Sequence, residues 1–540
     1  MSAPSSTGPS AQVDLGGRSP WSVLPPLLLG FFMIMVDTTI VNIAVPTLVD
    51  SFDVGLSAVG WVTSAYLLTY AVLLLVTGRL GDRFGPKNIF VAGLVVFTLS
   101  SLWCGFSGSI GMLITARAVQ GVGAALMTPQ TMAIITRVFP PQKRGAAMGV
   151  WGSVAGIATI TGPVLGGLFV ETLGWEWIFF INVPVGLVAL FFSFRALPAL
   201  ATDKKSFDVL GVVLSVIGLG ALVFGVQEGE TYDWGQVWGP VSIPLIIGLG
   251  VVVIVGFLLW QRRLGQDALL PLSLFHHRNF SLANVSGMTV SFAMIGIFFP
   301  LTLFLQTTLG LSPLHAALVS LPSSVVSGVV APFAGRLSDR VPAKWVMVTG
   351  FASLAVATVW LDLVIAPGIS AWTIVVPMLF FGLGTGCVFS PMASLATAGL
   401  DQSTAGAGAG AFNTTRQVGG VIGSAAIIAM LQTRLAVTLP AAAQDAARAL
   451  PEQYRQSFVD GFASMGGSFS GAGGSVPVPD GVPADVADAI SAAGSAAFGT
   501  GFAQAAGDTM LLVAGVLVVG LVSGVLMRRE SGHVAHVNSA

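Results

Sequence analysis

Two decapeptides, GRLGDRFGPK from Gly78 to Lys87 and GRLSDRVPAK from Gly335 to Lys344, determine how this sequence is interpreted. Six of the ten positions are identical, and the two copies start 257 residues apart. Charged residues make up only 9% of the chain, so two charge-dense segments of the same pattern stand out. Their recurrence predicts that the chain contains one structural unit twice.

The composition is that of a membrane protein. Of the 540 residues, 54% are hydrophobic, whereas a soluble globular domain carries about 25% charged residues to cover its surface. The net charge of −1 excludes a generally basic nucleic-acid binder, so no nucleic-acid partner is expected. Cys104 and Cys387 both lie in apolar runs, where we expect buried small hydrophobic residues rather than a disulfide or a metal site.

Fourteen apolar segments are long enough to cross a bilayer, which requires about 20 residues. They predict an all-α integral membrane protein with fourteen transmembrane helices. The expected spans are 22–45, 57–77, 88–106, 110–135, 146–170, 176–195, 208–227, 239–261, 280–304, 313–334, 345–365, 372–395, 411–433 and 507–528.

The connections between these segments alternate in charge. Lys and Arg gather after the even-numbered segments, except the twelfth, where Asp401 is the only charge. The short connections between them hold no Lys or Arg, and those after the first, fifth and seventh segments hold Asp or Glu. Since cytoplasmic loops carry the excess of basic residues, both termini are expected in the cytoplasm of a multi-pass protein of the plasma (inner) membrane. The polar stretch 434–506 is then external, and residues 1–21 form a disordered cytoplasmic tail.

The decapeptides follow the second and the tenth segments, which are equivalent places if each half contains six helices. The predicted organisation is an N-terminal six-helix bundle (22–195), two inserted helices with linkers (196–279), a C-terminal six-helix bundle (280–528, including the external loop 434–506) and a C-terminal tail (529–540). Two parallel repeats with a substrate site between them are typical of transporters.

The first decapeptide resembles the signature between the second and third helices of the major facilitator superfamily, G-x-L-a-D-r-x-G-r-k. Pro86 stands where that family usually has Arg. The resemblance implies the major facilitator fold, two six-helix bundles here extended by two helices, and a gating loop that holds the bundles together. Simple positive-inside topology is the alternative. The residues expected to act in gating are Gly78, Arg79, Asp82, Arg83, Gly85, Lys87, Asp339 and Arg340.

The first apolar segment carries an ionisable side chain at bilayer depth. VDTTIVNIAVP, Val36 to Pro46, resembles a signature of the fourteen-span drug:proton antiporters within the superfamily. An intramembrane carboxylate is costly and therefore a functional candidate, and desolvation favours its protonated form. We expect Asp37 to take part in proton coupling, with structural packing as the alternative. Asn42 is a candidate for the substrate cavity.

The fourth segment, LITARAVQGVGAALMTP, contains Arg117 and Gln120 and resembles another family signature. Arginine remains protonated, so it cannot carry the coupled proton. Its expected role is to tune a nearby carboxylate, whose identity the sequence leaves open; a snorkelling arginine is the alternative. Gln120 is a second candidate for the cavity.

The fifth segment contains Gly162, Pro163, Gly166 and Gly167, which match the G-P-x-x-G-G core of the family's antiporter motif. Small residues permit close helix contact, and proline bends a helix. In the family this motif marks exporters. In the thirteenth segment, FNTTRQVGG places Asn413, Arg416 and Gln417 together, to contact substrate, to close the inner gate or to pack.

The expected function is proton-coupled efflux of small hydrophobic or cationic drugs, such as antibiotics or toxic compounds, with the proton-motive force in place of a cofactor. An uptake symporter or metabolite facilitator on the same fold is the alternative. The five histidines form no helical metal motif and no phosphate-binding loop is present, so neither a metal site nor an enzyme is expected. Asp208, Glu228 and Asp362 lie near expected helix ends, where solvation or capping is expected. The sequence leaves the oligomeric state open.

Overall fold

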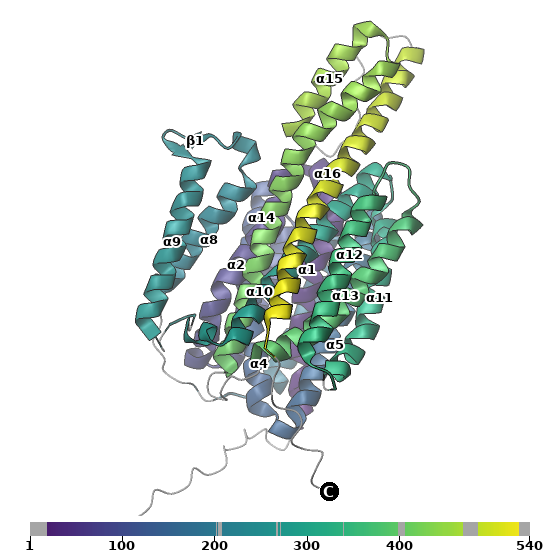
Figure 1. Ribbon diagram of the computed structural model, residues 1–540. Coiled ribbons are helices and arrows are strands. Elements are labelled where there is room, and N and C mark those ends of the chain that lie inside the picture. The colour runs from purple at the N-terminus through teal and green to yellow at the C-terminus, as the bar shows by residue number, and fades with distance from the viewer. Residues whose placement is uncertain are drawn as a thin grey trace, which may run out of the picture.

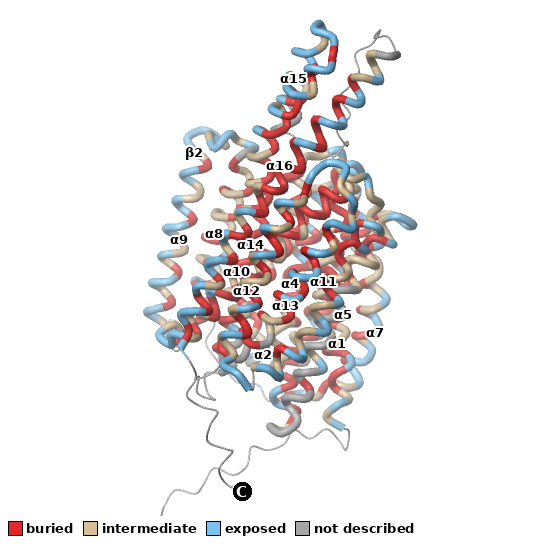
Figure 2. The backbone as a smooth tube through the Cα atoms, turned by 45° about the vertical axis from the view of Figure 1, so that its right-hand side comes forward, coloured by how far each residue is buried: buried red, intermediate tan, exposed pale blue. Residues whose placement is uncertain are grey.

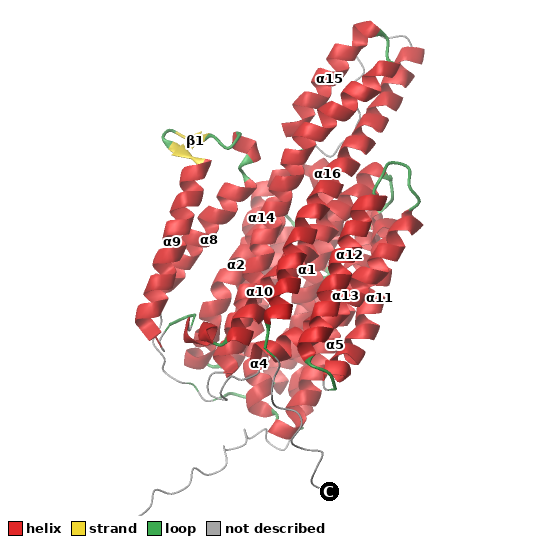
Figure 3. Cartoon of the chain, viewed as in Figure 1, coloured by secondary structure: helices red, strands yellow, loops and turns green. Residues whose placement is uncertain are grey.

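The computed structural model describes residues 19–200, 202, 208–265, 268–270, 272–338, 340–397, 405–467 and 484–528. Within these residues the chain is almost entirely helical, with one small strand pair (Figure 3). Each of the fourteen predicted segments overlaps a helix, and the segment 176–195 is divided between Trp177–Phe180 and Asn182–Ala196. Thirteen helices of the described part are long and apolar enough to cross a membrane, and the segment 146–170 lies in a further helix, Pro141–Thr172. The protein is therefore a multi-pass membrane protein, and the predicted all-α class is confirmed.

The first half of the chain contains η1 (Pro20–Val23), α1 (Leu24–Phe52), α2 (Leu56–Phe84), α3 (Pro86–Gly105), α4 (Ile110–Val138), α5 (Pro141–Thr172), α6 (Trp177–Phe180) and α7 (Asn182–Ala196). Local chemistry sets several of these ends. Gly85 has φ of 91°, which a residue with a side chain rarely adopts, and Pro86 then begins α3 with its fixed φ. The Ser109 hydroxyl accepts a hydrogen bond from the Met112 amide and so caps α4.

The inserted pair consists of α8 (Val209–Gln227) and α9 (Ile243–Leu264), joined through η2 (Glu230–Tyr232) and the strands β1 (Gln236–Trp238) and β2 (Val241–Ser242). The second half follows η4 (Leu272–His276). It contains α10 (Arg278–Leu303), the π turn η5 (Phe304–Thr308), α11 (Pro313–Ser338), α12 (Ala343–Val364), α13 (Ala371–Thr397), α14 (Ala405–Ala446), η6 (Ala447–Ala449), α15 (Glu452–Gly467) and α16 (Ala484–Leu526).

The two halves repeat one packing pattern. In the first half α1 packs on α5, α2 on α4, and α3 on α4 and α7; in the second, α10 packs on α14, α11 on α13, and α12 on α13 and α16. Glycines stand at equivalent crossings. A Cβ on Gly93 of α3 would lie 2.9 Å from the Gly123 carbonyl oxygen of α4, and a Cβ on Gly350 of α12 would lie 2.9 Å from the Gly384 carbonyl oxygen of α13. Close backbone approach at these crossings is what small residues allow in membrane helices.

The described part of the stretch 434–506, which the sequence predicts to be an external loop, is helical. Helix α14 continues to Ala446, and α16 begins at Ala484. With 42 and 43 residues, these helices are about 63 Å long at 1.5 Å per residue, twice the bilayer core of about 30 Å. Together with α15 they extend beyond the other helices (Figure 1). We call residues 434–467 and 484–506 the projection.

The projection has a hydrophobic core of its own. Buried residues occur along its helices (Figure 2). They include Leu439, Phe458, Phe462, Phe498 and Phe502. Burial of these side chains on folding explains why a stretch of moderate hydropathy remains helical outside the bilayer.

Both described chain ends lie on the side opposite the projection. Trp21 packs on Phe139 at the end of α4, and the Arg528 amide donates to Asn279 at the start of α10. We call this the terminal side and the other the projection side (Figure 1).

Asp208 clamps the terminal-side end of the inserted pair. Its carboxylate accepts hydrogen bonds from the Gly211 amide at 2.8 Å, which caps α8, and from Trp260 Nε1 and Gln261 Nε2 of α9, both at 2.8 Å. Burial alone would raise the pKa of Asp208, but these three hydrogen bonds and the charge of Arg79 outweigh it and lower the pKa from its usual 3.8. Asp208 therefore caps a helix, as expected, but is buried rather than solvated.

We expect Asp208→Ala to destabilise the protein by about 2 kcal/mol, because it removes a cap and two side-chain hydrogen bonds. A lowered folded-state pKa means that the stabilisation is present above pH 3.8 and is lost as the pH falls through the folded-state value. Thermal unfolding of the purified protein in detergent should show a lower melting temperature at pH 7 and a smaller difference in acid. Asp208→Asn, which can still cap, should lose less; equal melting temperatures for Asp208→Ala and the unmodified protein would refute the clamp.

Candidate functional site

Asp37 lies halfway along α1, and its side chain is 0% exposed. Its Oδ2 is 2.6 Å from Nη1 of Arg117, which projects from α4 with 1% of its side chain exposed. The two ionisable residues singled out in the sequence are therefore partners in one ion pair inside the first half. A pair this deeply buried must satisfy its remaining polar atoms within the protein.

Neutral polar side chains complete the hydrogen bonding of the pair. Gln120 Nε2 donates to Asp37 Oδ1 at 2.8 Å, and Gln120 Oε1 accepts from Arg117 Nη1 at 2.7 Å. Gln120 also lies 2.6 Å from Ser101 Oγ, and Asn182 Nδ2 lies 3.4 Å from Asp37 Oδ1 and 3.2 Å from Ser101 Oγ. Helices α1, α3, α4 and α7 thus meet at one buried network.

Arg117 is held on its other faces as well. Its Nε donates to the Val62 carbonyl oxygen of α2 at 3.0 Å, and its guanidinium carbon lies 4.2 Å from the Tyr66 ring centroid. These contacts fix the cation in place whether or not Asp37 is charged. A proton that neutralised Asp37 would leave the buried charge of Arg117 without its counter-charge.

Sequence reasoning found Asp37, Arg117 and Gln120 but missed Ser101 and Asn182. Asn182 lies in the apolar run GWEWIFFINVPVG and begins α7, so its amide in apolar surroundings was the available signal. Ser101 gave none, since serine is common in membrane helices. Asn42, expected to line the cavity, is not part of the network; its Oδ1 is buried and has no hydrogen-bond partner among the described residues.

The glycines of the fifth segment serve two contacts of α5. A Cβ on Gly162 would lie 1.9 Å from Thr39 Oγ1, and one on Gly166 would lie 2.8 Å from Ile40 Cγ1, both on α1. A Cβ on Gly167 would lie 2.6 Å from the Leu314 Cα of α11, in the other half. The motif therefore brings α5 close to both α1 and α11. Pro163 lies inside α5 between these glycines.

Among the described residues, several contacts between the halves lie toward the projection side, and we call this set the seam. Gln306 Nε2 donates to the Ile43 carbonyl oxygen at 2.9 Å, and Glu171 Oε2 accepts from the Leu314 amide at 3.3 Å, in the first turn of α11. A further contact of the seam joins a different pair of helices: Ser64 Oγ of α2 lies 2.8 Å from Ser424 Oγ of α14. Helix α2 is thus joined to α14, and α5 to α11, so the halves are closed together toward the projection side.

The first decapeptide is helical rather than a loop. Gly78, Arg79 and Arg83 lie within the last turns of α2, and Gly85 alone separates α2 from α3. The prediction of a gating loop was wrong in this respect, because an apolar span marks the bilayer and not the helix end. Arg79 Nη2 donates to the Ala268 carbonyl oxygen at 2.5 Å. Asp339 and the side chain of Asp82 lie outside the described residues, so their gating role stays a prediction.

The lysine that ends each decapeptide contacts a carbonyl oxygen at the C-terminal end of a helix in its own half. Lys87, in the first turn of α3, has Nζ 3.5 Å from the Phe194 carbonyl oxygen at the end of α7. Lys344, in the first turn of α12, has Nζ 3.0 Å from the Met527 carbonyl oxygen at the end of α16. A cation at a helix C-terminus satisfies carbonyl groups that lack intrahelical partners. Arg340 is exposed beside the start of α12.

Asn413, Arg416 and Gln417 lie on α14 where it meets α2. The Tyr70 phenol of α2 interacts electrostatically with Arg416 and Gln417, and its oxygen lies 2.9 Å from Thr128 Oγ1. Arg416 Nε is buried and has no hydrogen-bond partner among the described residues. The structure thus places Arg416 and Gln417 between the halves, and the Tyr70 ring lies 5.9 Å from the Tyr66 ring that covers Arg117.

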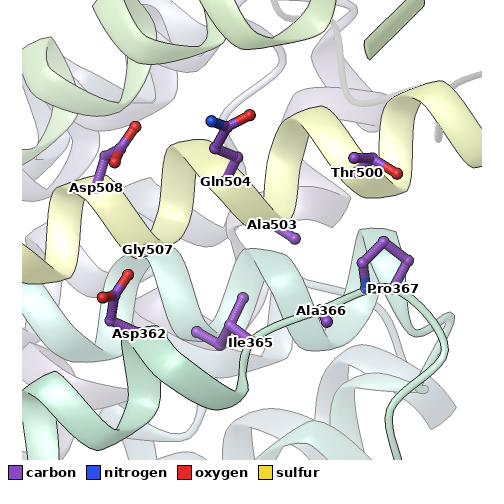
Figure 4. A pocket seen from close by; sticks show the side chains of 9 residues that line it. All are labelled: Asp362, Ile365, Ala366, Pro367, Thr500, Ala503, Gln504, Gly507 and Asp508. Atoms are coloured by element: carbon purple, nitrogen blue, oxygen red, sulfur yellow. The ribbon is translucent and has the colours of Figure 1, made fainter. Parts of the chain in front are cut away.

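A pocket of about 350 Å³ lies near the projection between α12 and α16 (Figure 4). Asp362 and Asp508 both line it, and Asp508 Oδ2 is 2.5 Å from Arg434 Nη2 of α14. Because its walls come from two helices of the second half, this pocket does not lie between the halves.

Comparison with known proteins places the fold and the site in context. The family model of the Major Facilitator Superfamily matches residues 27–424. Among solved structures, a bacterial homologue of the human lysosomal transporter Spinster, in an inward-facing and unoccupied conformation, is similar with a TM-score of 0.62, covering 94% of this chain and 98% of its own. At 16% sequence identity this likeness concerns the fold alone.

Curated relatives are more similar in sequence. The chain is 46% identical over 450 residues to the "Uncharacterized MFS-type transporter Rv1250" of Mycobacterium tuberculosis, covering 82% of this chain and 77% of the relative. It is 33% identical to the "Tetracenomycin C resistance and export protein" of Streptomyces glaucescens, covering 81% and 80%. It is 31% identical to the "Riboflavin transporter RibZ" of Clostridioides difficile, covering 76% and 87%.

Proposed function

The chain belongs to the major facilitator superfamily, and from that premise we propose that it exports hydrophobic small molecules in exchange for protons by alternating access. The protein is a transporter and not an enzyme. Its energy source in this proposal is the proton-motive force, without a bound cofactor. The terminal side, and with it both termini, faces the cytoplasm, because the basic residues of the short connections gather there.

The observation that carries the proposal is the buried Asp37–Arg117 pair. The Asp37 carboxylate is buried in the middle of the first half, 2.6 Å from Arg117, so it contributes nothing to the solubility of the protein. Burying the pair costs desolvation free energy, which packing alone does not justify. Proton binding at Asp37 breaks the charge balance with Arg117, which gives the proton a mechanical consequence. That is the requirement for coupling proton flow to a change between conformations.

The closed seam supports alternating access. With the halves in contact at the projection side, we take this conformation as the one closed toward the outside. Release outside requires the contacts of α2 with α14 and of α5 with α11 to separate. Arg416, Asn413 and Gln417 lie between the halves on α14, where we expect them to contact the substrate.

Hydrophobic or cationic drugs, antibiotics among them, are the proposed substrates. Export is favoured by the close packing of α5 on α1 and α11 through Gly162, Gly166 and Gly167, the motif that marks exporters in the resemblance above. Several relatives carry names of drug resistance or antibiotic export. A second candidate, movement of a metabolite by symport or facilitation on the same fold, is favoured by the relative named as a riboflavin transporter.

Proton movement in inside-out membrane vesicles tests the proposal. The vesicles contain the full-length protein, are acidified inside, and carry a pH-sensitive dye. We expect addition of a substrate drug to raise the lumenal pH, because drug enters the lumen as protons leave. The panel consists of lipophilic cations, polyketide antibiotics and riboflavin, and vesicles without the protein serve as the control.

The outcomes separate the two candidates. Drug-dependent alkalinisation above the control supports drug:proton antiport. Transport of riboflavin without proton movement, or with protons moving in the same direction, contradicts antiport and favours the second candidate.

A further inference from the structure

The inserted pair is bound to the projection-side end of α2 by polar contacts. Glu228, which follows α8 directly, accepts hydrogen bonds from Ser57 Oγ and Trp61 Nε1 of α2, both at 2.6 Å. Glu228 stands at the C-cap of α8, which agrees with the expectation of a capping residue, and its carboxylate is half-buried and joins two helices. Trp61 also packs its ring 6.2 Å from the Phe224 ring of α8.

The next residue along this contact reaches the other half of the molecule. Gln227 is fully buried, and its side-chain amide lies 2.6 Å from Ser64 Oγ. The same Ser64 Oγ lies 2.8 Å from Ser424 Oγ of α14. One serine of α2 therefore joins the inserted pair to the seam between the halves. One turn away, Gly60 packs against Ile428 of α14, where a Cβ would lie 2.5 Å from Ile428 Cδ1.

Apolar packing follows the same line. Leu219 and Val223 of α8 share a buried cluster with Val421 and Ala425 of α14. Helix α8 thus covers the line along which α2 meets α14, whereas α9 remains mostly exposed (Figure 2). The polar contacts of α8 go to α2, and its contacts with α14 are apolar.

The inserted pair also holds the opposite end of α2. The Ala268 carbonyl oxygen, which follows α9, accepts from Arg79 Nη2 in the last turns of α2. Asp208 ties α8 to α9 at this end. Helix α2 is therefore braced by one hairpin at both of its ends.

We propose that the inserted pair is part of the projection-side gate, and that Gln227 and Glu228 are positioning residues that hold α2 where Ser64 meets Ser424. The hairpin moves with α2, to which its directional hydrogen bonds are made, and slides off α14 when the halves separate. Loss of the Glu228 contacts frees the first turns of α2 and favours the conformation open at the projection side. The proposal rests on alternating access and not on the substrate or the coupled ion.

The test measures how often the seam opens. Ile428 is 1% exposed and lies in the seam, so Ile428→Cys reports opening by its rate of reaction with a maleimide. The experiment uses the purified full-length protein in nanodiscs, where both faces are accessible, with Cys104→Ala and Cys387→Ala as background. We expect Glu228→Ala to raise the labelling rate about tenfold, since hydrogen bonds to a charged group are lost. Glu228→Gln, whose amide oxygen can accept both hydrogen bonds, should stay within about twofold of the unmodified protein.

A second position distinguishes gate opening from loss of structure. Ala189 of α7 is fully buried and lies away from the seam, so the labelling of Ala189→Cys should not change. If it rises in Glu228→Ala, Trp61→Phe decides instead: it removes one donor, and we expect an increase of about threefold at Ile428→Cys. Unchanged Ile428→Cys labelling in a folded Glu228→Ala or Trp61→Phe variant overturns the proposal.

Discussion

Replacing Asp37 with Asn will stop substrate-driven proton movement through this protein. Asparagine keeps the shape of the side chain and can still accept a hydrogen bond from Gln120, but it neither takes up nor releases a proton at any pH of interest. Arg117 then lacks its counter-charge, which costs about 3 kcal/mol or more for a buried pair. The contacts of Arg117 with Val62 and Tyr66 remain and should preserve the local structure. We expect drug-dependent pH changes in inside-out vesicles to fall to those of vesicles without the protein.

A matched control lies on the same helix. Asp53 ends α1, is exposed, and has φ of 50°, a conformation that asparagine tolerates well. Asp53→Asn makes the same chemical change without touching the buried pair and should leave proton movement intact. Exchange of labelled drug across the membrane at equal concentrations should survive in Asp37→Asn, since it requires no proton. Proton movement that persists in Asp37→Asn would remove this residue from the coupling mechanism.

The second large effect is expected from Gly167→Val. The Cβ at position 167 would lie 2.6 Å from the Leu314 Cα and 2.8 Å from the Pro313 carbonyl oxygen. Both are backbone atoms of α11, so no side chain can swing away to make room. Overpacking of this kind costs about 3 kcal/mol, which corresponds to about a hundredfold in the population of the conformation with a closed seam. We expect transport to be lost and the protein to remain open at the projection side.

Two measurements check this prediction. Drug transport should disappear, and maleimide labelling of Ile428→Cys in the same chain should rise strongly. Gly515→Val is the control, because a Cβ at this position of α16 meets no atom within 4 Å. That variant should transport normally. Normal transport by Gly167→Val would mean that α5 and α11 need not approach as closely as they do here.

The membrane spans were predictable because apolar length decides which residues enter the bilayer. The helix ends were not, since hydropathy marks the bilayer boundary and says nothing of a helix that continues into water. Two helix ends differ from the predicted ones for this reason: α2 runs through Arg83, and α14 runs on to Ala446. In the projection, packing between helices replaces the bilayer as the source of stability, and that packing is set by contacts far apart in the sequence.

In the candidate site, too, single residues were predictable from the sequence, whereas the contacts between them were not. Asp37 and Arg117 could be found individually, because a charge at bilayer depth is rare. Their pairing depends on α1 lying beside α4 at one particular rotation, which no local pattern encodes. The contact of Glu228 with α2 could not be foreseen for a similar reason: its position near a helix end suggested solvent, whereas its partners lie about 170 residues earlier in the chain.

The projection is continuous with the second half and therefore moves when that half tilts. Since α14 and α16 run without interruption from the bilayer into the projection, any tilt of the second half is carried to α15. The part beyond the bilayer core is about 30 Å long, so a tilt of about 15° moves its tip by about 8 Å. A fluorophore on α15 would then report the transport cycle from outside the membrane. Conversely, a binding protein that immobilised the tip would arrest the cycle without reaching the substrate path.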